Sequence, residues 1–178
     1  MKSLCVFCGS SPGNDPRYLA VARELGGLLA RRKCTLIYGG GRVGLMGALA
    51  DAALQEGGRV VGVIPQLLLD KEVGHSGLSE LHVVATMAQR KQLMGDLSDA
   101  FLTLPGGIGT MDELFEAWTW TQLELHRKPC GVLNQDGYYD PLIAFLDQCV
   151  SKGFLRPRHR AALVVSTDLA TLVEALAR

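Results

Sequence analysis

The sequence has 178 residues, of which 48% are hydrophobic and 20% are charged, and its 18 basic residues balance its 18 acidic residues. A chain of this length suits a single domain over residues 1–178 and buries about 70% of its unfolded surface. Zero net charge excludes a strong electrostatic footprint for nucleic acid or an anionic membrane, and no segment approaches the ~20 uninterrupted apolar residues of a membrane span. We therefore expect no nucleic-acid partner and no membrane partner.

Apolar runs of strand length alternate with longer helical patterns along the whole chain. The runs predict seven strands, at residues 4–7, 34–38, 59–64, 82–86, 100–104, 130–133 and 162–165. The remaining patterns predict helices at residues 16–32, from the loop at 39–47 to about 56, at 87–97, 114–125 and 139–152, and after Asp168. Residues 66–81 are irregular and predict a loop with a short helical turn over 66–69. Because the strands are nearly all apolar, they predict a parallel sheet covered on both faces, in one doubly wound, Rossmann-like α/β domain.

Five cysteines lie mostly inside apolar runs, at Cys5, Cys8, Cys34, Cys130 and Cys149. The spacing of the first two is that of a redox pair, but both lie along a predicted strand, which directs their side chains to opposite faces. No second pair or nearby histidine completes a zinc site. The apolar run at the N-terminus is too short for a secretory signal. We therefore expect buried thiols in a reducing cytoplasm.

Three loops rich in glycine or serine follow predicted strands, at Gly9–Ser11, Gly39–Gly47 and Pro105–Thr110. In doubly wound sheets, ligands bind outside the carboxyl ends of the strands where the strand order reverses, so all three loops should open on one edge. Neither longer loop has the G-x-G-x-x-G motif that binds dinucleotides after the first strand, and the sequence contains no G-x-x-x-x-G-K-[ST] loop of nucleoside triphosphatases. Each loop therefore either touches a ligand or only turns the chain.

The stretch Leu104–Glu113 joins a predicted strand to a predicted helix. Its glycines let the backbone turn and leave N–H groups uncovered, and a helix N-terminus there favours an anion such as phosphate. Glu113 then has two interpretations. It either sits beside whatever the phosphate is attached to, or forms a capping box with Thr110, in which each side chain bonds the other's backbone N–H. Asp112 also fits as a simple partner of the helix dipole.

Met87, Arg90 and Lys91 share one face at the start of the preceding predicted helix. Two cations in a first turn oppose the helix dipole unless an anion compensates, and spacing alone favours a surface pair. On the following helix, Glu116 and Trp120 share the face of Glu113, which fits either a pocket for a flat base or core packing with the acid at its rim. The basic segment 156–160 is expected to form a solvated loop, the alternative being contact with a phosphate across a dimer.

Together these segments resemble the Lonely Guy family, the cytokinin riboside 5′-monophosphate phosphoribohydrolases, whose bacterial members were often labelled lysine decarboxylase. Residues 105–113 match its P-G-G-x-G-T-x-x-E signature, and residues 87–91 match its arginine–lysine pair after a methionine. Residues 38–47, 118–123 and 136–139 are similar as well, and the resemblance runs from residue 5 to about residue 154. The first two motifs together are highly specific.

The resemblance implies hydrolysis of the N-glycosidic bond of AMP or a cytokinin nucleotide, releasing the free base and ribose 5-phosphate. By this analogy Arg90 and Glu113 are the catalytic pair. A carboxylate near the anomeric carbon would stabilise oxocarbenium character and orient water, while the guanidinium holds substrate and carboxylate. The family also implies a homodimer and no metal or organic cofactor. The residues that it places around the substrate are Ser10, Gly40, Gly41, Glu80, Met87, Lys91, Gly106, Gly107, Ile108, Gly109 and Thr110.

The sequence leaves one competing function from a different class, a nucleotide-binding or carrier module with the same fold and phosphate loops that cleaves nothing. Retention of both Arg90 and Glu113 favours the enzyme. Lysine decarboxylation is rejected, because no lysine lies in a recognisable pyridoxal-binding context. Many relatives carry glutamate where Asp112 stands, so its role stays open, as does the choice between AMP and a prenylated nucleotide.

Overall fold

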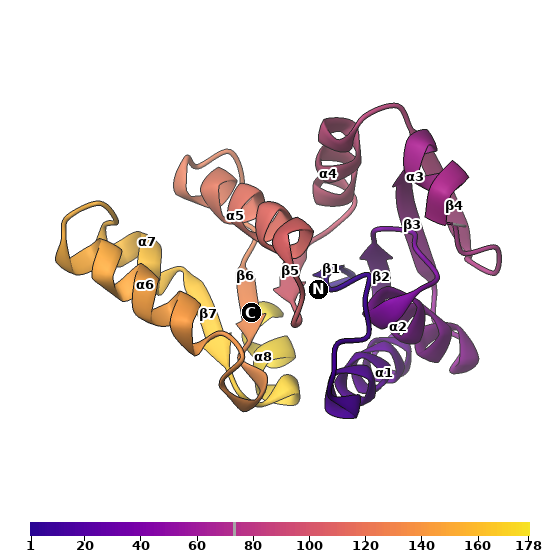
Figure 1. Ribbon diagram of the computed structural model, residues 1–178, viewed down its shortest axis with the longest axis horizontal. Coiled ribbons are helices and arrows are strands. Elements are labelled where there is room, and N and C mark those ends of the chain that lie inside the picture. The colour runs from indigo at the N-terminus through magenta and orange to yellow at the C-terminus, as the bar shows by residue number, and fades with distance from the viewer. Residues whose placement is uncertain (73) are drawn as a thin grey trace.

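In the computed structural model, which describes residues 1–72 and 74–178, one sheet runs through the molecule with helices on both faces (Figure 1). Its strands are β1 (Ser3–Phe7), β2 (Thr35–Tyr38), β3 (Val60–Pro65), β4 (Glu80–Val84), β5 (Ala100–Thr103), β6 (Cys130–Leu133) and β7 (Leu163–Ser166). The helices are α1 (Pro16–Arg31), α2 (Gly44–Gln55), α3 (Gln66–Glu72), α4 (Met87–Asp96), α5 (Ile108–Gln122), α6 (Asp140–Ser151), α7 (Pro157–Ala161) and α8 (Leu169–Leu176), with a 3₁₀ turn η1 (Gln135–Gly137).

The seven strands pair in the order β4-β3-β2-β1-β5-β6-β7, and every pairing is parallel. The strand order therefore reverses between β1 and β5, which pair directly with Cys5 opposite Phe101 and Phe7 opposite Thr103. The predicted fold class and all seven predicted strands are confirmed. By the general rule for such sheets, the reversal marks the edge where a ligand would bind.

Three elements differ from the sequence prediction. Helix α5 begins at Ile108, well before the predicted start, because Gly107 supplies an extended N-cap and the next residues are already helical. The predicted loop at 66–81 contains the helix α3, while its residue 73 lies outside the described residues. The basic segment is not a loop, because Pro157 at its first position favours helix α7 and Trp118 Nε1 donates to the carbonyl of His159 at 3.1 Å.

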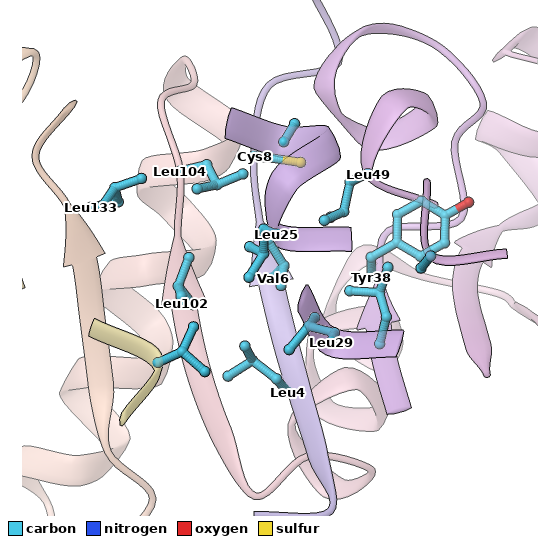
Figure 2. Packing of buried hydrophobic residues seen from close by; sticks show 14 of the residues in the cluster. Leu4, Val6, Cys8, Leu25, Leu29, Tyr38, Leu49, Leu102, Leu104 and Leu133 are labelled. Carbon is cyan, nitrogen blue, oxygen red and sulfur yellow. The ribbon is translucent and has the colours of Figure 1, made fainter. Parts of the chain in front are cut away.

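The core has two layers, one on each face of the sheet. The first lies under α1, α2 and α8, and Figure 2 shows part of it around Leu4, Val6 and Leu102. The second lies under α4, α5 and α6 and includes Phe101 and Trp118. Cys5 belongs to the second layer and Cys8 to the first, so the predicted opposite orientation of these thiols is confirmed.

Backbone hydrogen bonds join the three strand-end loops at one edge of the sheet. The N–H of Gly9 donates to the carbonyl of Pro105 at 3.1 Å, and the N–H of Leu45 donates to the carbonyl of Gly9 at 3.1 Å. Gly44 has a φ of +62° and lies so close to Ser10 that a Cβ would fall 2.3 Å from its carbonyl. The loops therefore open together at the reversal point. Among the described residues, none of the helices combines the length and the apolar character needed to cross a membrane.

Candidate active site

A cavity of about 280 Å³ lies between the three loops and the N-terminal ends of α4 and α5. Of the residues predicted for the site, those that line it are Ser10, Met87, Arg90, Gly107, Ile108, Gly109, Thr110 and Glu113. Gly40, Gly41, Glu80, Lys91 and Gly106 are not among its lining residues. Cavity residues that the sequence did not single out include Cys8, Met46 and Leu68. Leu68 belongs to α3, for which the sequence predicted only a single turn.

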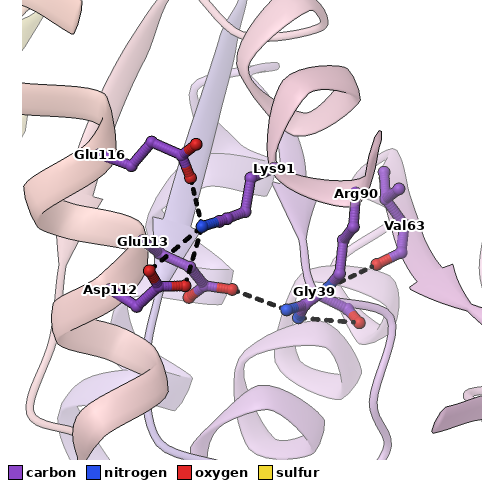
Figure 3. Close-up of polar contacts among 7 residues, drawn as sticks. All are labelled: Gly39, Val63, Arg90, Lys91, Asp112, Glu113 and Glu116. Atoms are coloured by element: carbon purple, nitrogen blue, oxygen red, sulfur yellow. Dashed lines mark hydrogen bonds and ion pairs between the residues drawn. The ribbon is translucent and has the colours of Figure 1, made fainter. Parts of the chain in front are cut away.

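Arg90 is buried at the wall of this cavity and makes three side-chain hydrogen bonds, shown in Figure 3. Its Nη1 donates to Oε1 of Glu113 at 2.8 Å, its Nε to the carbonyl of Val63 at 3.1 Å, and its Nη2 to the carbonyl of Gly39 at 3.3 Å. Both side chains of the ion pair are only 9% exposed. The guanidinium is therefore fixed, because a carboxylate and two carbonyls from different segments hold it.

The start of α4, the helix that carries Arg90, is capped by two side chains. Thr86 caps the helix by accepting from the N–H of Gln89 at 3.1 Å, and the side chain of Gln89 accepts from the N–H of Ala85 at 3.0 Å. Two backbone donors at the helix end are satisfied in this way. The surface-pair interpretation of Arg90 is wrong, because burial against β3 overrides what the spacing favours.

The capping-box interpretation of Glu113 is also wrong. It requires Thr110 to precede the helix, but α5 begins two residues earlier, and its N-cap Gly107 has no side chain to accept a bond. Glu113 therefore lies in the second turn, and its carboxylate is free to pair with Arg90. Burial raises the pKa of the Glu113 carboxyl above its ordinary value of 4.5, and the charge of Arg90 opposes that rise.

Lys91 turns away from the cavity toward α5 (Figure 3). Its Nζ lies 3.0 Å from the carboxylate of Asp112 and 2.5 Å from that of Glu116. These ion pairs join α4 to α5, and none of the three residues lines the cavity. Glu116 and Trp120 line a narrow void of about 10 Å³ behind Glu113 and an open hollow of about 710 Å³ beside α4. Neither residue lines the cavity that holds Arg90, so this arrangement does not support a base pocket there.

The N-terminus of α5 forms the opposite wall of the cavity. The first N–H groups of a helix have no intrahelical partner, and no side chain caps this one. A Cβ placed on Gly107 or Gly109 would meet no atom within 4 Å, so both glycines leave the backbone open to the cavity. On Gly106 a Cβ would fall 2.1 Å from Oγ1 of Thr110, so this glycine serves packing instead. The geometry suits a phosphate.

Two tyrosines that the sequence noted only for their family resemblance support this loop. The hydroxyl of Tyr138 donates to the carbonyl of Gly106 at 2.8 Å, and the hydroxyl of Tyr139 donates to the carbonyl of Leu104 at 2.7 Å. Their donors satisfy loop carbonyls. These two hydrogen bonds fix the backbone of the loop just before the start of α5.

The other glycine loop holds Arg90 and a neighbouring histidine. Gly39 accepts from Arg90, and Gly40, at a φ of +77°, accepts from the N–H of His75 at 3.0 Å. A Cβ on Gly39 would fall 1.9 Å from Nη2 of Arg90, so only glycine leaves room for the guanidinium. Glu80 lies on the edge strand β4, where it pairs with Arg59 at 2.5 Å and with His82 at 2.8 Å.

This fold and site define a doubly wound α/β protein with an uncapped helix start and a buried acid–guanidinium pair at its reversal point. The family model described as "Possible lysine decarboxylase" matches residues 46–176. A cytokinin riboside 5′-monophosphate phosphoribohydrolase of Rhodococcoides fascians is 49% identical over 176 residues, or 98% of this chain and 89% of that protein. A cytokinin riboside 5′-monophosphate phosphoribohydrolase of Arabidopsis thaliana is 47% identical over 175 residues, which cover 98% of this chain and 81% of that protein. The chain belongs to this family of phosphoribohydrolases, the Lonely Guy family.

Solved structures resemble the chain at lower identity. The molybdenum cofactor carrier protein of Chlamydomonas reinhardtii matches with a TM-score of 0.74 at 19% identity, over 98% of this chain and 95% of that one. The molybdenum cofactor binding protein of Rippkaea orientalis matches with a TM-score of 0.74 at 21% identity, over 99% of this chain and 96% of that one. At these identities the likeness shows the shared fold alone.

Proposed function

We propose that this protein hydrolyses the N-glycosidic bond of a purine ribonucleoside 5′-monophosphate, releasing the free base and ribose 5-phosphate. The observation that carries the proposal is the buried pair of Arg90 and Glu113, which faces the uncapped start of α5 across one cavity. The names of relatives that are almost half identical along nearly the whole chain support it. The volume of about 280 Å³, just below the ~300–1,000 Å³ typical of small-ligand sites, suits a small ligand such as a mononucleotide.

The proposed reaction follows from what these residues can do. With the 5′-phosphate at Gly107–Thr110, the ribose would lie between the helix start and Glu113. The bond between C1′ and the base nitrogen breaks, and its electron pair leaves with the base. Water adds its oxygen to C1′, and the proton that it loses is transferred to the base. Glu113 would stabilise the developing positive charge and orient the water, while Arg90 fixes the carboxylate.

The direct test is incubation with AMP and with isopentenyladenosine monophosphate, followed by chromatography for free base and an assay for ribose 5-phosphate. Release of both products supports the proposal, and the ratio of kcat/KM values identifies the preferred base. The matched control is Glu113→Gln, which keeps the side-chain volume and removes the charge. Free base released at the wild-type rate by this variant would contradict the assigned role.

The carrier function remains the second candidate because two proteins named as binding or carrying a cofactor share the fold. It makes a different prediction for the same assay. Nucleotide would bind, as measured by calorimetry, but neither substrate would yield free base or ribose 5-phosphate.

We also propose that the protein acts as a homodimer through the face that carries β4 and α4. A shallow hollow of about 710 Å³ on this face is lined in part by Val83, Ala88, Leu93 and Trp120. Val83 and Met87 are 46% and 43% exposed, and Met87 also lines the catalytic cavity. A second copy seated here would therefore bury apolar surface and cover the edge strand beside the cavity mouth.

The proposed location is the cytoplasm. All five cysteines are free, and four of them are buried, which supports a reducing compartment. Cell fractionation with an antibody against the full chain tests this part of the proposal.

A further inference from the structure

A second cavity of about 260 Å³ adjoins the catalytic one, and nothing in the proposed reaction uses it. Both cavities are lined by Gly9, Ser10 and Gly107. The rest of the second cavity is formed mainly by Tyr18 and Tyr138, with loop backbone between them. We call it the tyrosine cavity.

The boundary between the two cavities is mostly backbone. Gly9 and Gly107 have no side chain, and a Cβ on Gly107 would meet nothing within 4 Å. The third shared residue, Ser10, is exposed and small. A phosphate at the start of α5 would therefore touch both cavities, and a substituent on its outer oxygen could enter the tyrosine cavity.

The aromatic walls are held in place before any ligand arrives. Tyr138 is tied through its hydroxyl to the carbonyl of Gly106 at 2.8 Å. Its ring meets that of Tyr18 edge to face, with centroids 5.7 Å apart and planes at 74°, and meets Tyr139 at 4.8 Å and 87°. Apart from these rings, the lining offers serine hydroxyls, an apolar leucine, prolines and backbone, and it includes no charged side chain. Such a site suits a flat, neutral, aromatic ring.

We propose that the tyrosine cavity binds the second base of a pyrophosphate-bridged dinucleotide whose first nucleotide occupies the catalytic cavity. This inference rests on the proposed function, because it takes the 5′-phosphate of the hydrolysable nucleotide to lie at Gly107–Thr110. Hydrolysis of such a ligand follows the same balance as for AMP: water adds to C1′, and the base leaves with the electron pair and a proton. For diadenosine pyrophosphate, the products are adenine and ADP-ribose.

The test measures dissociation constants by calorimetry for AMP, ADP and diadenosine pyrophosphate on the full-length Glu113→Gln variant, which would hold the ligands without turnover. The step from AMP to ADP reports the second phosphate, and the step from ADP to the dinucleotide reports the second nucleoside. We expect the dinucleotide to bind at least tenfold more tightly than ADP, with one dinucleotide per chain. Tyr18→Leu in the same background should reduce that gain to less than threefold. Phe145→Leu changes an exposed ring of α6 that lines neither cavity, so it is the matched control and should keep the gain.

Several results would overturn the inference. They are a dinucleotide that binds no more tightly than ADP, a gain that Tyr18→Leu leaves intact, or two AMP molecules bound per chain. If Tyr18→Leu fails to fold, the comparison of ADP with the dinucleotide on the parent variant still decides. Adenine release from AMP by the wild type separates the two proposals. If the wild type releases adenine from AMP but the dinucleotide binds no more tightly than ADP, the proposed function stands and the second site is rejected. If the dinucleotide binds more tightly but no adenine is released, the second site stands and the proposed function is rejected.

Discussion

Arg90 and Glu113 are 23 residues apart and lie on different helices, yet Nη1 of the arginine is 2.8 Å from Oε1 of the glutamate in a buried ion pair. The arginine is also held by the carbonyl of Val63 within β3 and by that of Gly39 just after β2. Strands from one half of the sheet therefore set the position of a carboxylate that belongs to the other half. The predictions below test this arrangement and the loop opposite it.

The first prediction concerns the ion pair itself. Glu113→Gln and Arg90→Ala should each reduce kcat/KM by roughly 10²–10³-fold or more, since each removes a charge aimed at the reacting centre. Arg90→Ala should also lower the free energy of unfolding by about 3–5 kcal/mol, because it leaves a buried carboxylate unpaired. The double variant should recover part of that stability in urea titrations. Stability losses that simply add would show that the pair is not coupled.

The second prediction concerns pH. Burial raises the pKa of Glu113 above 4.5, and the charge of Asp112 adds to the rise, while the charges of Arg90 and Lys91 oppose it. The acid limb of kcat/KM should therefore lie above pH 4.5. It should move to lower pH in Asp112→Asn and to higher pH in Lys91→Met. The substrate phosphate titrates in the same way with every variant. Acid limbs of kcat/KM that lie at the same pH in all variants would therefore contradict the assignment of the limb to Glu113.

The same raised pKa has a consequence for stability. Between pH 4.5 and the raised pKa, the folded protein binds a proton at Glu113 that the unfolded chain has released. The contribution of this group to the free energy of unfolding should therefore fall as pH rises through that window. Glu113→Gln should remove that dependence from melting curves recorded across it.

The third prediction contrasts two neighbouring glycines. Gly107→Ala should leave the melting temperature unchanged, because its φ of −98° suits alanine and no atom lies within 4 Å of the new methyl group. It should raise KM about tenfold, since the methyl group would cover N–H groups offered to the phosphate. Gly106→Ala should instead lower stability by about 1–3 kcal/mol, because its Cβ would fall 2.1 Å from Oγ1 of Thr110. Equal effects of the two changes would contradict the assigned division of roles.

The fourth prediction separates the catalytic pair from the phosphate site. Gly39→Ala would place a methyl group 1.9 Å from Nη2 of Arg90 and should displace the guanidinium. We expect kcat to fall at least tenfold, while inhibition by ribose 5-phosphate changes little, because the start of α5 is untouched. Loss of inhibitor binding together with kcat would show instead that the glycine loop holds the phosphate.

The fifth prediction concerns assembly. Val83→Glu would place a charge in the exposed apolar hollow beside α4, so it should convert a dimer into monomers in light-scattering measurements. Phe154→Glu is the control, because that ring is exposed on the loop between α6 and α7, away from this face. A wild-type protein that is monomeric at micromolar concentration would contradict the proposed dimer.

Local pattern was enough to predict the strands, because an apolar run such as Ala100–Thr103 is a property of neighbouring residues and needs no partner to be recognised. Local pattern is also the basis for predicting an anion site at Leu104–Glu113, since glycines before a helix expose the same backbone groups in any fold. The boundaries of α5 and α3 were harder to predict from the sequence. The glycines at the start of α5 and the leucines of α3 fit a loop as well as a helix when only neighbouring residues are considered.

Tertiary structure alone decided which groups Glu113 and Arg90 contact. Spacing allowed a capping box for one and a surface pair for the other. The capping box was wrong because α5 begins at Ile108, ahead of Thr110, and the surface pair was wrong because α4 packs Arg90 against β3 and α5. The same packing turned Lys91 toward Glu116 and away from the cavity, and it placed the hydroxyl of Tyr138 against the carbonyl of Gly106. Such contacts join segments far apart in the chain. Their energies depend on burial and on the partner supplied, and neither quantity is present in the local order of residues.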